Sequence, residues 1–239
     1  MIKISAIKYI NSLPFIYGIT KYKNFINNIK LLCDNPNNLR SFILNNDVDI
    51  SLCPTGMIKE LNNYNIISNF CISSFKYVKS VILVSNYLLK DIKSIQLDKE
   101  SCTSNYLLKI LLNFYWNKNN IEYKYDNTNT DAYLMIGDKA LMNYNSKKFT
   151  YYIDLSYEWY KFTKLPFVFA LWVGKNNLER KTIKTFNKSL QYGINSIKNN
   201  KLKIETKSYY DYIKNNIQYK MNYSKKLSLK LFLKYQKQL

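Results

Sequence analysis

The chain has 239 residues and is 47% hydrophobic, enough to bury the core of one large domain or two small ones. Its formal net charge is +20, a balance that usually indicates nucleic acid or an acidic membrane surface as partner. Arginine, whose side chain is best suited to hydrogen-bond the edges of DNA bases, occurs only as Arg40 and Arg180. The lysines are scattered along the whole chain. We therefore expect no nucleic-acid partner. Since no apolar run reaches membrane-spanning length, we also expect no membrane insertion.

Histidine is absent from the sequence, which removes the commonest general base, the Ser-His-Asp triad and a frequent metal ligand. The cysteines form no closely spaced pair, and each lies in or beside an apolar run; they are Cys33, Cys53, Cys71 and Cys102. We therefore expect buried free thiols and no metal site. Free thiols suit a reducing compartment, and the first seven residues lack the apolar core of an export signal. The sequence thus favours the cytoplasm.

The first part of the chain alternates between strands and helices. We expect strands at 3–7, 29–33, 48–53 and 66–72, and helical segments at 15–22, 37–44 and 57–61. This order predicts a parallel sheet. Asn11 follows the first strand, and Thr55 and Gly56 follow the third, at the carboxyl ends where open α/β sheets bind ligands. Asn11 is also an ordinary turn former, so both interpretations stay open at this point.

A long strand at 78–85, with Ser80 near its start, precedes a second series of strands and helices. We expect strands at 95–97, 121–125, 133–136 and 151–155, and a helix at 104–116. Three hydroxyls lie around the start of that helix, those of Ser101, Thr103 and Ser104, and they are either ordinary caps or part of an anion site at the free N–H groups. Asp138, which follows the strand 133–136, is either a helix N-cap or a substrate contact.

The most apolar strand of the chain is expected at 165–173, followed by helices at 179–197, 209–215 and 224–235. Two long strands bracket the middle of the chain, which suggests two lobes joined by two crossing strands. One lobe is expected to contain residues 1–85 and 174–239, and the other residues 86–173. Because pockets form preferentially at domain interfaces, we expect the site in the cleft between the lobes.

Several of these segments, taken in order, resemble the chorismate dehydratases of the futalosine route to menaquinone. The segments that carry the resemblance are 4–14, 48–54, 78–85, 97–104, 136–141, 154–159 and 165–172. The tail from 175 to 239 matches only in its helical pattern. The chain departs from that family in two turns. Asn46 stands where the family usually has a glycine, and the turn before Ser80, residues 74–77, lacks the glycine that the family has there.

The resemblance implies an α/β fold of two lobes like the type II periplasmic binding proteins. It also implies a lyase that removes water from chorismate to give 3-[(1-carboxyvinyl)oxy]benzoate, without a metal or organic cofactor. In the family pattern Asn11 and Ser80 fall at catalytic positions. The residues expected to bind the substrate are Thr55, Gly56, Thr103, Ser104 and Asp138. Trp159 is either a site residue or part of the core.

Two alternatives remain at this stage. One is the sister enzyme, a 1,4-dihydroxy-6-naphthoate synthase, which carries a histidine base between an isoleucine and an acidic residue. This chain has Ile136-Gly137-Asp138 at that place, so the base is missing, which favours the dehydratase. A protein that binds a small anion without chemistry is also compatible with the fold. The missing export signal argues against a transport receptor, although a basic surface attracts a small dianion in either case. The sequence leaves the oligomeric state open.

Overall fold

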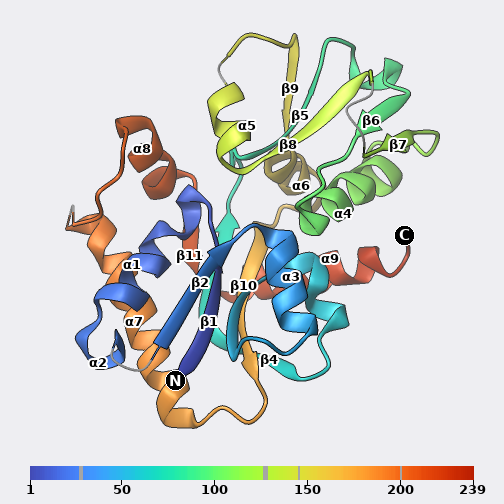
Figure 1. Cartoon of the computed structure of the whole chain (residues 1–239). Helices are drawn as coiled ribbons and strands as arrows, with labels where there is room; N and C mark the ends of the chain where they lie inside the picture. The colour runs from blue at the N-terminus through green and yellow to red at the C-terminus, as the bar shows by residue number, and fades with distance from the viewer. Residues whose placement is uncertain (27–28, 126–128, 145, 200) are drawn as a thin grey trace. The chain divides into compact units, whose positions relative to one another are not determined.

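The computed structural model describes residues 1–26, 29–125, 129–144, 146–199 and 201–239. The chain forms two compact units, each built on its own sheet (Figure 1). The first unit contains residues 1–73 and 168–222, and the second contains residues 74–167 and 223–239. The chain therefore passes between the units at the end of β4 (Tyr64–Ser74), at the start of β10 (Phe167–Lys175) and at the start of α9 (Tyr223–Gln236).

This division differs from the expected lobes. Residues 74–85 belong to the second unit because β5 (Val81–Ser85) pairs with two strands of that unit. Residues 168–173 belong to the first unit, where β10 pairs with β3. The tail from 223 belongs to the second unit because α9 packs there: Trp159 Nε1 donates to Ser228 Oγ at 2.9 Å. Trp159 is fully buried against Phe167 and Phe232, so it is a core residue.

The sheet of the first unit has the strand order β11-β4-β10-β3-β1-β2. Its remaining strands are β1 (Ile2–Ile7), β2 (Ile29–Asp34), β3 (Ile50–Pro54) and β11 (Gln218–Lys220). Strand β1 runs parallel to both β2 and β3, as the alternation of strands and helices predicts. Strand β10 returns from the second unit and runs antiparallel to β3, with Ala170 opposite Pro54, so the sheet is mixed.

Helices cover both faces of this sheet, with α1 and α7 side by side on one face and α3 on the other (Figure 1). The helical segments are Ile10–Ser12, α1 (Leu13–Lys21), α2 (Lys23–Ile26), α3 (Pro36–Leu44), the 3-10 turn Thr55–Glu60, α7 (Arg180–Lys198) and α8 (Lys207–Asn215). Capping follows ordinary rules: the side chain of Asn35 accepts from Asn38 N at the start of α3, where Pro36 stands first. The expected helix at 57–61 is the 3-10 turn.

The sheet of the second unit has the order β7-β6-β8-β5-β9. Its other strands are β6 (Ser94–Gln96), β7 (Glu122–Lys124), β8 (Ala132–Ile136) and β9 (Tyr151–Asp154). Strands β6, β7 and β8 are parallel, whereas β5 is antiparallel to both β8 and β9. Strand β5 begins at Val81 and not at Val78, because residues 78–80 form a turn described below.

The helical segments of the second unit are Leu89–Asp91, α4 (Cys102–Ile110), the π-helical turn Leu111–Tyr115, α5 (Gly137–Asn143) and α6 (Leu155–Thr163), in addition to α9. The expected helix at 104–116 is confirmed, but its last turn is wider: Trp116 N donates to Leu111 O at 2.8 Å. Helix α6, whose N-cap is Asp154, was not expected from the sequence.

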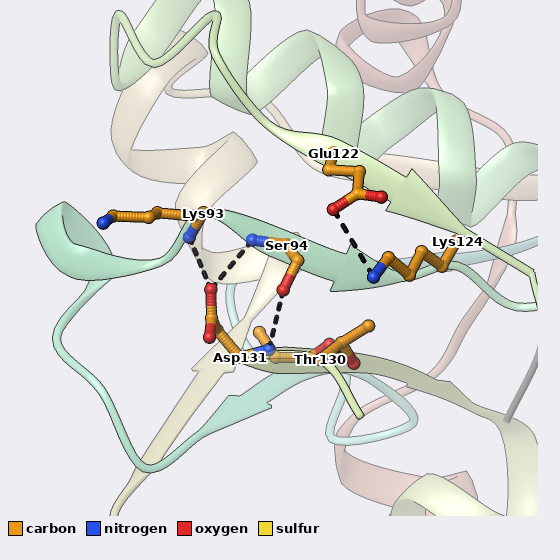
Figure 2. Close-up of polar contacts among 7 residues, drawn as sticks. Lys93, Ser94, Glu122, Lys124, Thr130 and Asp131 are labelled. Atoms are coloured by element: carbon orange, nitrogen blue, oxygen red, sulfur yellow. Dashed lines mark hydrogen bonds and ion pairs between the residues drawn. The ribbon is translucent and has the colours of Figure 1, made fainter. Parts of the chain in front are cut away.

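At the amino-terminal edge of this sheet, Asp131 holds the starts of β6 and β8 together (Figure 2). Its Oδ2 accepts from the backbone N–H groups of Lys93 at 2.8 Å and Ser94 at 2.9 Å. In return, the Asp131 N–H donates to Ser94 Oγ at 3.1 Å. The Lys93 N–H is the main cause that lowers the pKa of Asp131. This reciprocal contact sets the register in which Ile95 lies opposite Ala132.

Each of the two turns in which this chain departs from the family that it resembles contains a residue with positive φ. Asn46 has φ 57°, and asparagine is among the few non-glycine residues that adopt this region readily. Lys76, in the turn before Ser80, has φ 67°. These backbone conformations explain why glycine is suited to both turns.

The crossing of α1 and α7 depends on two glycines, since a Cβ at Gly193 would lie 1.9 Å from Pro14 O and one at Gly18 would lie 2.1 Å from Ser189 O. Gly193→Ala should therefore destabilise the protein by about 1–3 kcal/mol, although alanine is the better helix former. Urea unfolding measures the change. Lys188→Ala, at an exposed position of the same helix, is the control and should change little. A Gly193→Ala protein as stable as the parent would contradict the close packing.

Candidate active site

In the first unit, the expected site residues gather at one edge of the sheet. Strands β1 and β3 are parallel neighbours, with Ser5 opposite Ser51, so their carboxyl ends lie at the same edge. Asn11 lies in the 3-10 turn that follows β1, and Thr55 and Gly56 begin the turn that follows β3. The structure thus brings together the three residues that the sequence placed at strand ends.

Asn11 is held by three hydrogen bonds. Its Nδ2 donates to the Tyr212 hydroxyl at 3.3 Å, and its Oδ1 accepts from Ser12 Oγ at 3.3 Å. Its backbone carbonyl accepts from the Tyr219 hydroxyl at 2.9 Å. Both tyrosines are buried, and burial raises the pKa of Tyr219 well above its ordinary value. A side-chain amide fixed in this way can act as a directed hydrogen-bond donor.

Thr55 contributes a buried hydroxyl for which the described part of the chain provides no hydrogen-bond partner. Buried polar atoms are nearly always paired, so an unpaired one at a strand end is a candidate contact for a bound ligand. Gly56 is buried beside it. The edge of the first sheet therefore offers an amide and a hydroxyl, which suit a polar or anionic group.

In the second unit, the remaining expected residues also share one edge of their sheet. Strands β6 and β8 are parallel, so α4 with Thr103 and Ser104 and α5 with Asp138 both begin at their carboxyl edge. Because β5 is antiparallel to β8, with Val81 opposite Ile136, Ser80 lies at the same edge. The Ser80 carbonyl accepts from Gly137 N at 2.8 Å, which joins this residue to the start of α5.

The turn that carries Ser80 is held by the buried carboxylate of Asp154. Its Oδ2 accepts from Val78 N at 2.9 Å and Lys79 N at 2.7 Å, and Lys79 adopts φ 64°. Its Oδ1 accepts from Ser156 N at 3.0 Å and Tyr157 N at 3.1 Å at the start of α6. Burial raises the pKa of Asp154 to about 6, although the four N–H donors oppose the rise. Asp154 therefore connects α6 to the residue before Ser80.

The start of α4 carries out the ordinary capping function that the sequence left open. Ser101 Oγ accepts from Ser104 N at 3.2 Å and lies 2.9 Å from Ser104 Oγ. Asp98 Oδ1 accepts from the N–H groups of Glu100 and Ser101, and burial raises the pKa of Asp98. Thr103 is buried in the same first turn. Capping and anion binding are compatible here, because a helix start has more N–H groups than one cap satisfies.

Asp138 is not the N-cap of its helix, because α5 begins at Gly137 with Ile136 in the capping position. Gly137 has φ 60°, a conformation that favours glycine, and Asp138 is half-buried in the first helical turn. A carboxylate at this position interacts favourably with the helix dipole. It therefore remains a candidate substrate contact.

Two general features accompany the site. Within the ranges that the structure describes, no three cysteine, aspartate or glutamate side chains are grouped as metal ligands would be. Among the helices of those ranges, none is both long enough and apolar enough to cross a membrane.

Comparison with known proteins connects this arrangement to a family. A family described as menaquinone biosynthesis matches the chain over residues 2–238. The chain belongs to the menaquinone biosynthesis family. A chorismate dehydratase from Campylobacter jejuni is 30% identical over 95% of this chain and 94% of its own length. A chorismate dehydratase from Thermus thermophilus is 26% identical over 66% of this chain and 69% of its own length.

Solved structures show the fold of this family member. A protein from Archaeoglobus fulgidus has a TM-score of 0.78 at 16% identity, covering 99% of this chain and 97% of that one. A Candida albicans protein described as having the generic periplasmic binding protein fold has a TM-score of 0.71 at 13% identity, covering 100% and 90%. The α/β fold like that of periplasmic binding proteins is thus confirmed, and at these identities the likeness concerns the fold alone.

Sequence reasoning missed the groups that hold the expected site residues of this family member. Tyr212 lies on a helix that was expected, but its contact with Asn11 spans 201 positions of the sequence. Tyr219 lies in β11, which the alternation of apolar and polar residues from Ile217 to Lys220 could have revealed. Asp154 was recognised as part of a matching segment, without its bonds to Val78 and Lys79.

The raised pKa of Asp154 predicts the direction in which the free energy of unfolding changes with pH. Its pKa is about 6 in the folded protein against an ordinary value of 3.8, so the proton-linked part of its contribution to stability is complete below pH 3.8 and is lost as the pH rises through 6, while the four hydrogen bonds that it accepts remain. Asp154→Asn does not titrate, but it costs on the order of 2 kcal/mol because its NH₂ faces N–H donors. We expect the difference in unfolding free energy between parent and variant to shrink from pH 4 to pH 7 in urea titrations.

Asp49 provides a control of opposite sign. At this carboxylate the effect of burial is outweighed by the Lys3 N–H and the Lys175 ammonium, which lower its pKa. Its contribution is present above the unfolded pKa of 3.8 and is lost as the pH falls through the lower folded pKa, so the difference between the parent and Asp49→Asn should grow as the pH rises toward 4 and stay nearly constant above it. A growing difference for Asp154→Asn as well would contradict the raised pKa.

Proposed function

We propose that this chain is a chorismate dehydratase, a carbon–oxygen lyase that converts chorismate to 3-[(1-carboxyvinyl)oxy]benzoate and water. The observation that carries the proposal is the 30% identity with the Campylobacter jejuni chorismate dehydratase across 95% of the chain. The family match over residues 2–238 supports it, because that match includes both units and every residue of the expected site.

In the proposed reaction the substrate supplies its own base, because the sequence has no histidine. The enolpyruvyl carboxylate takes the proton from C3, whose acidity is raised through the ring double bond by the C1 carboxylate. The electrons of the C3–H bond pass into that conjugated system and return to form the C3–C4 double bond as the C4 hydroxyl leaves. The proton and the hydroxide together make one water, and the ring becomes aromatic. The protein needs only to position the substrate and stabilise charge.

Asn11 and Ser80 are the proposed catalytic residues. The Asn11 amide donates to the departing hydroxyl or to the negative charge that develops on the ring carboxylate. Ser80 donates to the carboxylate that acts as base. The proposed substrate-binding residues are Thr55, Gly56, Thr103, Ser104 and Asp138. The unpaired hydroxyl of Thr55 and the N–H groups at the start of α4 supply donors for an anionic substrate.

A reaction in a reducing compartment is part of this proposal. All four cysteines are free thiols, and two of them, Cys53 and Cys71, are buried. Cys53 lies in β3, immediately before the turn that carries Thr55. Proteins of oxidising compartments commonly use such residues in disulfides, so free thiols favour the cytoplasm.

The direct test is to mix the purified protein with chorismate in the presence of a metal chelator and follow the products by mass spectrometry and ultraviolet absorbance. We expect loss of one water and appearance of the aromatic enol ether. If chorismate binds, as measured by calorimetry, but is recovered unchanged, the protein is an anion-binding member of the family and the proposal is wrong.

The proposed catalytic residues are tested by truncation. Asn11→Ala and Ser80→Ala should each lower kcat by about 10²–10³-fold, the usual cost of removing one donor to developing charge. Asn187→Ala and Ser85→Ala are matched controls, because these side chains also make hydrogen bonds but lie elsewhere: Asn187 bonds to Ser68 and Ile67, and Ser85 lies at the other end of β5. Parent-like turnover by Asn11→Ala would remove that residue from the mechanism.

A further inference from the structure

The contacts of Asn11 with the carboxyl-terminal part of the first unit suggest a role for two tyrosines. Tyr212 on α8 and Tyr219 on β11 lie 201 and 208 positions from Asn11 in the sequence, yet each makes a hydrogen bond to it. One bond reaches the side-chain amide and the other the backbone carbonyl. The two tyrosines therefore restrain different parts of the same residue.

Tyr219 is itself placed by the core. Its ring packs edge-on against Phe15 with centroids 5.2 Å apart, and Phe15 packs edge-on against Trp172 at 5.5 Å. Strand β11 is paired with β4, where Gln218 lies opposite Ser73. Because the ring is buried and its strand is paired, its hydroxyl has a defined position and can donate to Asn11 O at 2.9 Å.

Tyr212 and Ser12 contact the two ends of the Asn11 amide. An asparagine amide has one oxygen that only accepts and one nitrogen that only donates, with two hydrogens. In this structure the nitrogen donates to Tyr212 and the oxygen accepts from Ser12 Oγ. One bond to Tyr212 uses one hydrogen, and the second hydrogen is the donor that the mechanism requires.

We infer that Tyr212 and Tyr219 are positioning residues for catalysis, which hold the Asn11 amide in the place from which it donates to the substrate. This inference rests on the proposed function, in which Asn11 donates to an oxygen of chorismate. Tyr212 restrains the side-chain amide, and Tyr219 restrains the backbone of the turn Ile10–Ser12 that carries it. Neither tyrosine is required to contact the substrate.

The test measures kcat and KM for Tyr212→Phe and Tyr219→Phe, which keep the rings and remove the hydroxyls. We expect kcat to fall about tenfold with KM within about twofold, because small errors in the position of a reacting group lower the rate more than they lower binding. Tyr210→Phe is the matched control: Tyr210 is also on α8, and its hydroxyl bonds to Ile197 O at 3.1 Å and not to Asn11. It should keep the parent kcat.

A double-mutant cycle separates positioning from a general loss of structure. If the tyrosines act through Asn11, each Tyr→Phe change should cost less than about twofold in an Asn11→Ala background. A tenfold loss in that background would overturn the inference. If a tyrosine variant folds poorly, Ser12→Ala tests the same role, because it removes the donor to Asn11 Oδ1. This variant should also lower kcat without raising KM.

A readout without substrate tests the positioning of Asn11 separately from the proposed reaction. In protein labelled with ¹⁵N-asparagine, the side-chain NH₂ signals of Asn11 are identified by their absence in Asn11→Ala. We expect Tyr212→Phe and Tyr219→Phe to shift these signals and Tyr210→Phe to leave them unchanged. A parent protein inactive on chorismate would refute the proposed function, while unshifted Asn11 signals, or parent-like kcat in both Tyr→Phe variants, would refute the positioning role.

Discussion

The four hydrogen bonds that the Asp154 carboxylate accepts are the interaction on which the second unit most depends. Two come from the turn before β5 and two from the first turn of α6, so one buried side chain joins a loop to a helix. The turn holds Lys79 at positive φ, a conformation that lysine adopts only when surrounding contacts enforce it. Ser80 follows directly, and its carbonyl is fixed by Gly137 N. The position of a proposed catalytic hydroxyl therefore depends on a carboxylate that need not touch the substrate.

The first unit uses tyrosine hydroxyls for the same purpose. Asn11 lies in a short 3-10 turn, which has too few backbone bonds of its own to hold a side chain rigidly. Tyr212 and Tyr219 supply what the turn lacks, and their rings are buried in the unit to which Asn11 belongs. In both units a residue at a strand end is held by a buried polar group from a distant part of the sequence. Preorganisation of this kind is what a site without a strong base requires.

The composition agrees with such a site. A chain without histidine has to rely on carboxylates, lysines, tyrosines, hydroxyls, amides or the chemistry of its substrate. The two sheet edges contain groups of these kinds, together with the carboxylate of Asp138. The net charge of +20 adds a general attraction for anions, while scarce arginine argues against a specific nucleic-acid surface. Membership of the menaquinone biosynthesis family is consistent with these features.

The sequence by itself determined the order of most strands and helices, the strand ends at which Asn11, Thr55 and Asp138 lie, and the family. Those properties depend on local periodicity and on turn chemistry, which short segments encode. Only the tertiary structure decided which segments belong to which unit, that residues 78–80 form a turn and not a strand, and that Tyr212, Tyr219 and Asp154 hold the proposed site residues or the turns that carry them. Those contacts join segments 75 or more positions apart, and no local pattern specifies which distant partner fills a given place.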